Sequence, residues 1–233
     1  MVSQKHDGNT QIILVDGYSV DDTLKIASGY PNITVITEKP HGEPDAINRG
    51  MRLATGDIVT FLDGDDTYCP NALRTVERYF HNPYLQWVYG KAYFINPAGQ
   101  RIRRLITLAK EYLQKDYSYN KLCYLCFIAQ PSVFMRREFQ QKVGDYNTEK
   151  KLIFDYEYWL RAGKLADPVF IPEYLSSMRA HNGSISVKFS REQMEESLNI
   201  IREFKQQNKY AYHVRHAILR STELYYKTVG EWL

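Results

Sequence analysis

Apolar and polar positions in the first third of the chain follow one recurring pattern, in which a short apolar run is followed by a polar turn and then an amphipathic segment. Residues 11–15 are apolar and end in the turn 16–19, which predicts a buried strand that breaks into a loop. The acidic pair Asp21 and Asp22 then offers capping oxygens for a helix over residues 23–28. The same order continues with predicted strands over 33–36 and 57–62 and a predicted helix over 45–54.

Strands that alternate with helices in this way are typical of an α/β protein with a mainly parallel sheet covered by helices. Ligands of such sheets bind beyond the carboxyl ends of the strands. Asp16 and the acidic stretch Asp63-Gly-Asp-Asp66 both follow predicted strands directly. The pattern therefore predicts a binding site at this edge.

The rest of the chain contains weaker signals. Between residues 101 and 127 no element is predicted. The other predictions are helices over 70–79, 137–143 and 154–162, a strand over 130–135, and paired strands over 87–89 and 92–95 around the turn 96–99.

The C-terminal part reads as a helical extension. Residues 190–208 are amphipathic, and Met194, Leu198, Ile201 and Phe204 are spaced for one buried face. A last helix is predicted over 210–226. We therefore expect one main domain over residues 1–189 and a helical extension over 190–233.

Composition narrows the class of protein. A chain of 233 residues with 44% hydrophobic content can bury one large core. Its 30 basic and 27 acidic residues are too balanced to indicate a nucleic-acid partner. No apolar run resembles a signal peptide or a membrane span, so we expect a cytoplasmic protein, which could still lie at the inner face of a membrane. Cys69, Cys123 and Cys126 are interpreted as reduced thiols, the last two as packing residues.

The acidic stretch is the strongest chemical candidate. Asp63, Asp65 and Asp66 place three carboxylates within four residues, and such charges repel one another unless a cation compensates. A hard divalent ion, Mg²⁺ or Mn²⁺, bound together with ligand phosphates would do so. The alternative is a solvated turn that caps the next helix.

Three segments resemble a known family in order and spacing. They are ILVDGYSVDDT (13–23), EKPHGEPDAINRG (38–50) and ATGDIVTFLDGDD (54–66). Together with later motifs around residues 130, 144, 155–161 and 179–181, they make residues 10–185 similar to family 2 glycosyltransferases. The resemblance implies the GT-A fold and inverting transfer from a nucleotide-diphosphate sugar, with a UDP-sugar favoured. It also implies a saccharide or glycolipid acceptor, in polysaccharide or glycoconjugate biosynthesis.

The same resemblance assigns the donor site. Asp16 matches the acid that contacts the nucleotide base, and its alternative is a turn or helix cap. Asp65 and Asp66 match the acids that approach ribose, diphosphate and metal. Asp63 lies one step before them and is expected to contact substrate. Asp45 and Asn48 match a helix start that borders the nucleotide, although an N-cap and an exposed helix polar residue are equally good interpretations.

Asp155 matches the acid that heads an acidic and aromatic helix in the family, where it takes the acceptor's proton; its alternative is a helix cap. Glu157 is interpreted as an acceptor contact or a structural residue. Trp159 could stack on the acceptor sugar or lie in the core. The remaining candidates are Gln130 beside the acceptor, Arg179 at the diphosphate, and His181 at the diphosphate or the metal.

One departure from the family bears on activity. Its members have a further strand and helix before the position of Ile12, and that strand is central in the sheet. We therefore expect an open strand position, which a homodimer could cover. A non-catalytic nucleotide-sugar-binding relative remains the alternative. A nucleotidyltransferase is disfavoured, because no Gly-rich basic loop is present near residue 10.

Overall fold

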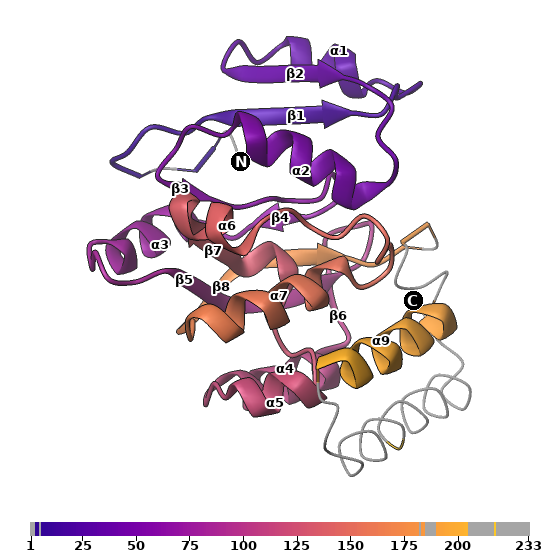
Figure 1. Ribbon diagram of the computed structural model, residues 1–233. Helices are drawn as coiled ribbons and strands as arrows, with labels where there is room; N and C mark the ends of the chain where they lie inside the picture. The colour runs from indigo at the N-terminus through magenta and orange to yellow at the C-terminus, as the bar shows by residue number, and fades with distance from the viewer. Residues whose placement is uncertain (1–2, 5, 182, 185–189, 205–216, 218–233) are drawn as a thin grey trace.

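The computed structural model describes residues 3–4, 6–181, 183–184, 190–204 and 217 (Figure 1). It has an α/β architecture, as the sequence predicts, with two separate sheets and helices packed on them. Within the described residues, no helix is long and apolar enough to cross a membrane. The helix predicted over 210–226 lies outside the described residues.

The N-terminal sheet contains two parallel strands, β1 (Ile12–Asp16) and β2 (Ile33–Thr37), with Ile12 opposite Ile33. Helix α1 (Thr23–Ser28) connects them, and α2 (Glu43–Leu53) packs against β1. The strand and helix predictions here are confirmed, except that α2 begins two residues earlier than predicted. Because Ile47 and Met51 of α2 are buried in the main core, α2 joins this sheet to the rest of the molecule.

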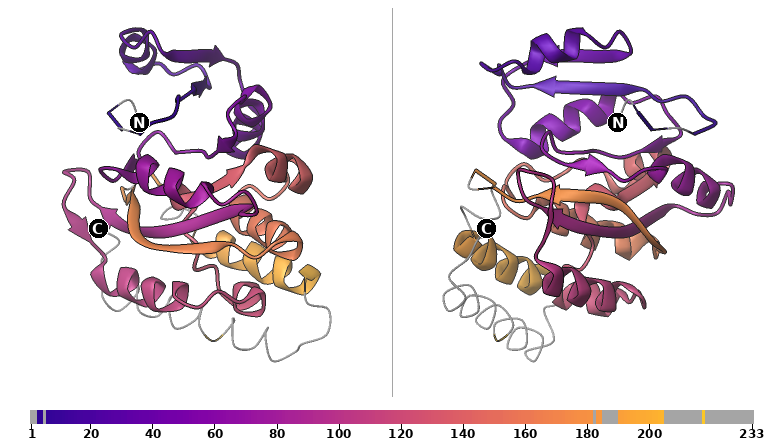
Figure 2. Two further views of the ribbon diagram at one scale, coloured as in Figure 1. Left: turned by 90° about the vertical axis from the view of Figure 1, so that its left-hand side faces the viewer. Right: turned by 180° about the vertical axis from the view of Figure 1, so that it is seen from behind.

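The main sheet has six strands in a mixed arrangement (Figures 1 and 2). Parallel pairing joins β5 to β8, and the other pairs are antiparallel. The strand order is β3 (Ile58–Val59), β7 (Val133–Arg136), β5 (Trp87–Ile95), β8 (Val169–Arg179) and β4 (Thr67–Tyr68), with β6 (Arg101–Ile102) paired to the end of β5. Strands β3, β5 and β8 consequently run in one direction, and β4, β6 and β7 in the other.

Helices cover this sheet and form two buried clusters. The larger contains Trp87 of β5 and Trp159 of α7 (Phe154–Leu165), whose rings stack with centroids 5.9 Å apart. The smaller lies under α3 (Ala72–Phe80). The remaining helices are α4 (Arg104–Gln114), α5 (Tyr119–Tyr124), the short 3-10 helix η1 (Gln130–Ser132), α6 (Arg137–Val143) and α9 (Ser190–Phe204). In α9, Leu198 and Ile200 are buried, and Ile200 belongs to the larger cluster.

In the main sheet one strand prediction is wrong and one strand was missed. Residues 87–89 and 92–95 form one continuous strand, β5, and the turn at 96–99 leads into β6 instead. Strand β8 was not predicted, because Pro172 and its polar neighbours interrupt the apolar pattern. The register between β5 and β8 shifts at Gly90, so Pro172 lies in a bulge, where its missing N–H costs no ladder bond.

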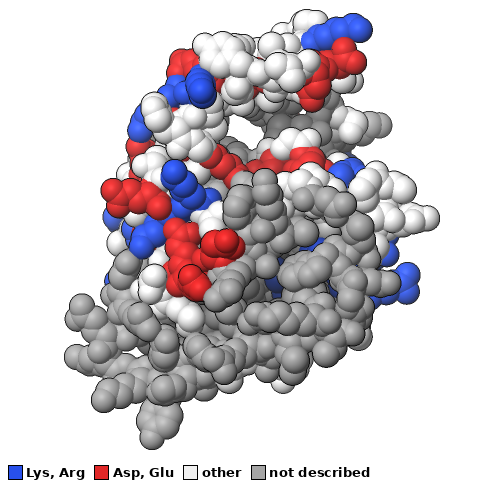
Figure 3. Space-filling view, turned by 90° about the vertical axis from the view of Figure 1, so that its right-hand side faces the viewer, with Lys and Arg blue, Asp and Glu red and all other residues white. Residues whose placement is uncertain are grey.

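The third strand of the sequence pattern is also shorter than predicted. Residues 57–62 were expected to be extended, but only Ile58–Val59 form β3, which pairs with β7 on one side. Among the described strands, β1 pairs with β2 alone. Figure 3 looks toward the carboxyl ends of β1 and β2 and shows a hollow between the N-terminal sheet and the rest of the molecule. The expected open strand position thus corresponds to a break between two sheets.

Candidate active site

The acidic loop that follows β3 is held by the end of β8. The Asp66 N–H donates to the Asp63 carbonyl at 3.1 Å, which closes a turn. The Arg179 N–H donates to Asp66 Oδ1 at 2.8 Å, and Arg179 Nε donates to the Asp65 carbonyl at 3.0 Å. Arg179 Nη1 also donates to the carbonyls of Asn96 and Pro97. Arg179 therefore positions the loop through the Asp66 carboxylate and the Asp65 carbonyl, a role that the sequence did not reveal.

His181 follows β8 by two residues and reaches the same loop. Its Nε2 lies 2.9 Å from Asp65 Oδ2, and both side chains are more than one third exposed. The two predicted metal ligands Asp65 and His181 are thus neighbours, although 116 positions separate them in the chain. Asp66, the third predicted ligand, is adjacent but bonded to the Arg179 backbone.

A further carboxylate, Glu43, belongs to this group and was missed in the sequence. It is the first residue of α2 and follows Gly42, whose φ of 109° only glycine adopts readily. Burial raises the pKa of Glu43 to about 8, helped by the charge of Asp63 and a hydrogen bond between the two side chains, and by the charges of Asp155 and Asp65. An acid in the first helical turn is so common that the sequence gives no reason to single it out.

The pKa values of the neighbouring acids are raised as well. Burial raises the pKa of Asp63 to about 6 and that of Asp66 to about 7, and nearby carboxylates add to both shifts. Burial also raises the pKa of Asp155, which lies in the first turn of α7, while the Lys110 charge opposes this shift. Carboxylates therefore come together from three segments that are distant in the chain, around residues 43, 63–66 and 155. Their negative charges repel one another at this site.

Such a cluster is chemically suited to a hard divalent cation. Carboxylate oxygens are the ligands that Mg²⁺ and Mn²⁺ prefer, and the His181 nitrogen suits Mn²⁺. In the part of the chain that the structure describes, no three His, Cys, Asp or Glu side chains are arranged to hold a metal ion by themselves. The donor set fits a cation that takes its remaining ligands from phosphate oxygens.

Asp16 lies on the other side of the break between the sheets. It is buried at the end of β1, and its Oδ2 accepts the Ser19 N–H at 3.0 Å. Tyr18, two residues after Asp16, has a positive φ of 65°, which this tight turn requires. The side chain thus orders its own turn, as its alternative interpretation predicts.

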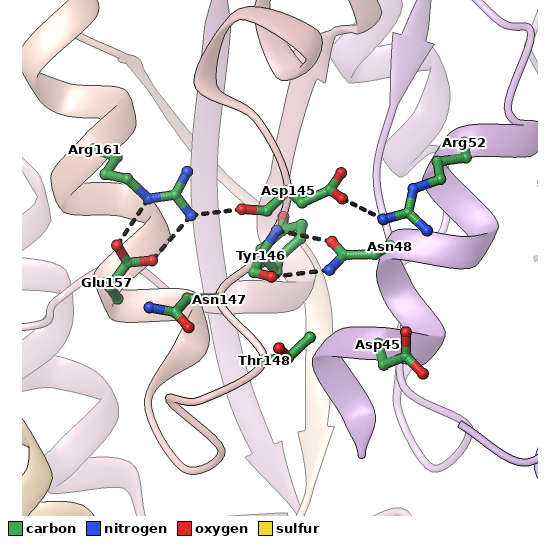
Figure 4. Close-up of a pocket in the computed structure, with 9 residues that line it drawn as sticks. All are labelled: Asp45, Asn48, Arg52, Asp145, Tyr146, Asn147, Thr148, Glu157 and Arg161. Atoms are coloured by element: carbon green, nitrogen blue, oxygen red, sulfur yellow. Dashed lines mark hydrogen bonds and ion pairs between the residues drawn. The ribbon is translucent and has the colours of Figure 1, made fainter. Parts of the chain in front are cut away.

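Three other predicted residues line a separate cavity of about 510 Å³ between α2 and α7 (Figure 4). Asn48 is buried and exchanges two hydrogen bonds with the Tyr146 backbone, at 2.8 and 2.7 Å. Glu157 is buried and forms a two-bond ion pair with Arg161. Asp45 accepts the His41 N–H at 2.8 Å and pairs with Arg49 at 3.0 Å. All three carry structural contacts, which the sequence could not distinguish from substrate contacts.

The cavity and the acidic cluster lie on different faces of the same two helices. Glu43 and Asp155 belong to the cluster, whereas Asp45 and Glu157, each two positions further on, line the cavity. Two helical residues correspond to a rotation of about 200°, so they point to nearly opposite sides. The predicted site residues therefore divide into two groups, and the chemistry concentrates in the first.

Two residues predicted to contact the acceptor, Trp159 and Gln130, make contacts within the protein. The Trp159 side chain is only 1% exposed and packs among Trp87, Tyr146 and Tyr158. It therefore lies in the core, and the prediction that it stacks on an acceptor sugar is wrong. Gln130 is half-buried, and its Nε2 donates to the Phe61 carbonyl at 3.0 Å, next to the acidic loop. Cys123 is buried and Cys126 is half-buried, and neither forms a disulfide.

The fold agrees with that of known proteins that the chain resembles. The model of the glycosyl transferase family 2 matches residues 1–144, which is more than half of the chain. The protein belongs to this family.

Its relatives include an uncharacterized glycosyltransferase of Haemophilus influenzae, 24% identical over 87% of this chain and 69% of that protein. A PGL/p-HBAD biosynthesis glycosyltransferase of Mycobacterium bovis is 26% identical over 75% of this chain and 65% of that protein. The chain thus spans about two thirds of the length of these curated relatives.

Solved structures show the same fold. S. aureus TarS 1-349 in complex with UDP-GlcNAc has a TM-score of 0.64 at 16% identity, over 90% of this chain and 61% of that one. The mannosyltransferase PcManGT of Pyrobaculum calidifontis, in complex with GDP-Man and Mn²⁺, has a TM-score of 0.63 at 16% identity, over 90% and 60%. The GT-A fold expected from the sequence is confirmed.

Proposed function

We propose that the protein transfers a glycosyl group from a nucleotide-diphosphate sugar to a hydroxyl acceptor, with inversion at the anomeric carbon. The observation that carries the proposal is the convergence of Glu43, Asp63, Asp65 and Asp155 at the carboxyl edge of β3. Family membership supports the reaction class, and the nucleotide sugars bound by the two structural neighbours support the donor class.

Asp65 and Asp66, with His181 beside Asp65, would hold Mg²⁺ or Mn²⁺. The cation would supply positive charge to the diphosphate as it leaves. Asp63 and Glu43, whose side chains are hydrogen-bonded to each other near Asp65, would lie beside this site, and the resemblance assigns the nucleotide base to Asp16. The sequence favours UDP over other nucleotides through this resemblance.

Asp155 would act as general base. In a one-step displacement, the acceptor oxygen bonds to the anomeric carbon as the bond from that carbon to the diphosphate oxygen breaks. The acceptor hydroxyl loses its proton in the same step, and the Asp155 carboxylate receives it. The raised pKa of Asp155 makes it a better proton acceptor than an exposed aspartate.

The proposal is tested by transfer and binding assays on one pair of variants. Asp155→Asn should lower transfer by about 10²- to 10⁴-fold, because a positioned general base contributes that much. Binding of UDP with Mn²⁺ should be retained. Asp145→Asn is the matched control, since Asp145 is half-exposed, lies near α7 and pairs with Arg52. Equal turnover in Asp155→Asn and Asp145→Asn would refute the assignment of the base.

A non-catalytic nucleotide-sugar-binding protein is the second candidate. The observation in its favour is the break between β1 and β3, which separates Asp16 from the acidic cluster. This candidate predicts UDP binding with no transfer to any acceptor tested. Screening nucleotide sugars with Mn²⁺ for thermal stabilisation, followed by assay of released nucleotide, distinguishes it from the enzyme.

A further inference from the structure

Helix α4 presents an apolar face to solvent. Leu105, Leu108 and Tyr112 are 71%, 59% and 76% exposed, and Ala109 between them is exposed as well. Their spacing of three, four and seven positions places all four on one side of the helix. Helices at a protein surface normally bury such a stripe. In α4 the buried residues are the polar Thr107 and Gln114 instead.

The inversion has a structural basis on the inner side. Gln114 Nε2 donates to the Phe127 carbonyl at 2.9 Å, and the Gln114 carbonyl accepts from the Tyr89 hydroxyl. Thr107 Oγ1 donates to the Arg103 carbonyl. The two Gln114 bonds attach the end of α4 to the protein with Gln114 on the inner side, whereas the Thr107 bond stays within the helix; the apolar stripe lies on the outer side. An exposed apolar patch of this kind marks an interaction surface.

Positive charge is concentrated in the segment that carries the stripe, although Arg101, Arg103 and Lys110 lie over aromatic rings of β5. Residues 101–116 contain five basic residues (Arg101, Arg103, Arg104, Lys110, Lys115) and two acidic ones (Glu111, Asp116), a net charge of +3. The whole chain also carries +3, so the remaining residues, 25 basic and 25 acidic, balance. The chain's excess positive charge therefore comes from the segment that carries the exposed stripe.

The acid within α4 does not offset this charge at the surface. Glu111 accepts from the Tyr174 hydroxyl and lies 3.5 Å from Lys91, with a side chain 16% exposed. Arg104 and Lys115 are exposed at the two ends of the stripe. Asp116 is exposed beyond the last turn. The outer side of α4 therefore combines two leucines and a tyrosine with cations at both ends.

We propose that the outer face of α4 (Leu105, Leu108, Ala109 and Tyr112, with Arg104 and Lys115) docks on an anionic lipid surface. Leucine and tyrosine side chains enter the boundary between headgroups and acyl chains, and cations are attracted to anionic headgroups. Figures 1 and 2 place α4 on the side of the molecule opposite the β1–β2 sheet, so docking leaves that sheet free.

This orientation also has a consequence that rests on the proposed function. Lys110, on the inner side of α4, is close enough to Asp155 to lower its pKa. The surface that docks and the proposed base are therefore on opposite sides of one helix. An acceptor sugar attached to a membrane lipid would therefore have to extend past α4 to reach the base.

The test is co-sedimentation of the full chain with vesicles of phosphatidylcholine containing 30% phosphatidylserine. We expect binding to these vesicles and much weaker binding to phosphatidylcholine alone. The triple variant Leu105→Gln, Leu108→Gln, Tyr112→Gln should bind these vesicles at least about tenfold more weakly than the unchanged protein. Arg104→Gln with Lys115→Gln should weaken binding by about fivefold for each charge removed.

The matched control changes the same residue types elsewhere. Leu53, Leu165 and Tyr84 are 52%, 50% and 87% exposed, and their triple Gln variant should bind vesicles like the unchanged protein. Unchanged thermal melting and UDP binding in solution show that each variant is folded, and neither readout depends on lipid. A failure of UDP binding in the unchanged protein would count against the proposed function and not against docking.

Three results would overturn the docking proposal. One is the absence of vesicle binding by the unchanged protein. Another is equal loss of binding in the α4 triple variant and its control. The third is a dimer of the unchanged protein that the α4 triple variant converts to a monomer with no change in lipid binding, which would make this face a contact between copies.

Discussion

The two sheets of this molecule are built from similar apolar sequences but differ in burial. In the main sheet, Trp87, Val88 and Tyr89 of β5 are fully buried, and both hydrophobic clusters involve its strands. In the N-terminal sheet, Ile12, Ile13, Leu14 and Val15 are only half-buried, and Val35 of β2 is 38% exposed. The difference comes from neighbours, because among the described strands β1 pairs with β2 alone.

The difference matters for function because the two parts of the proposed donor site lie on different sheets. Asp65, Asp66 and His181 are attached to the main sheet through β8, and Asp155 through α7, whereas Glu43 belongs to α2. Asp16 is attached to the N-terminal sheet, which joins the core mainly through α2. We therefore infer that the metal and proton chemistry is held more rigidly than the nucleotide base position.

Hydrogen exchange should show the largest difference between the sheets. Amides of β5 and β7 should exchange only on global unfolding, whereas amides of β1 and β2 should exchange through local opening. We expect protection factors at least about 10²-fold higher in β5 than in β1, measured by mass spectrometry of peptides from each strand. Equal protection would mean that the N-terminal sheet is stabilised by contacts other than those described.

One substitution made in each sheet measures the same contrast as stability. Ile171 of β8 is fully buried, and Ile171→Ala should lower the free energy of unfolding by about 2–5 kcal/mol. Ile13 of β1 is half-buried, and Ile13→Ala should cost less than half as much. Urea titration of both variants checks the ratio. A larger loss from Ile13→Ala would contradict the weak packing of β1.

The acidic cluster should make stability depend on pH in the absence of metal. The folded-state pKa values of Glu43, Asp63 and Asp66, about 8, 6 and 7, lie above their ordinary values near 4. The folded state therefore binds protons more tightly than the unfolded state, and stability falls as pH rises from about 4 to 8. The Tm should be higher at pH 5 than at pH 8, and Mn²⁺ should raise it more at pH 8.

The variant Asp63→Asn tests the origin of that slope. Removing this charge also removes repulsion on Glu43, so the fall in Tm between pH 5 and pH 8 should become smaller. Asp57→Asn, in the exposed turn before β3, should leave the slope as it is. A slope that Asp63→Asn does not alter would place the titrating groups elsewhere.

The sequence predicted much of the fold because the first 80 residues repeat one clear pattern. It failed at β5 and β8, where a bulge at Gly90 and Pro172 disturbs the period, and at β3, where an absent neighbour shortens the strand. In the site, the motifs predicted Asp65, His181 and Asp155, which the fold brings near one another. It could not identify Glu43 or the structural contacts of Asn48, Trp159 and Arg179, because these depend on which distant segments meet.

Titration calorimetry of UDP tests the central claim most directly, namely that the acids at the end of β3 hold a metal-bound diphosphate. The account predicts UDP binding that requires Mn²⁺, a loss of affinity of at least about tenfold in Asp65→Asn, and normal affinity in Asp57→Asn. UDP binding that is equally strong without Mn²⁺ and in Asp65→Asn would contradict it.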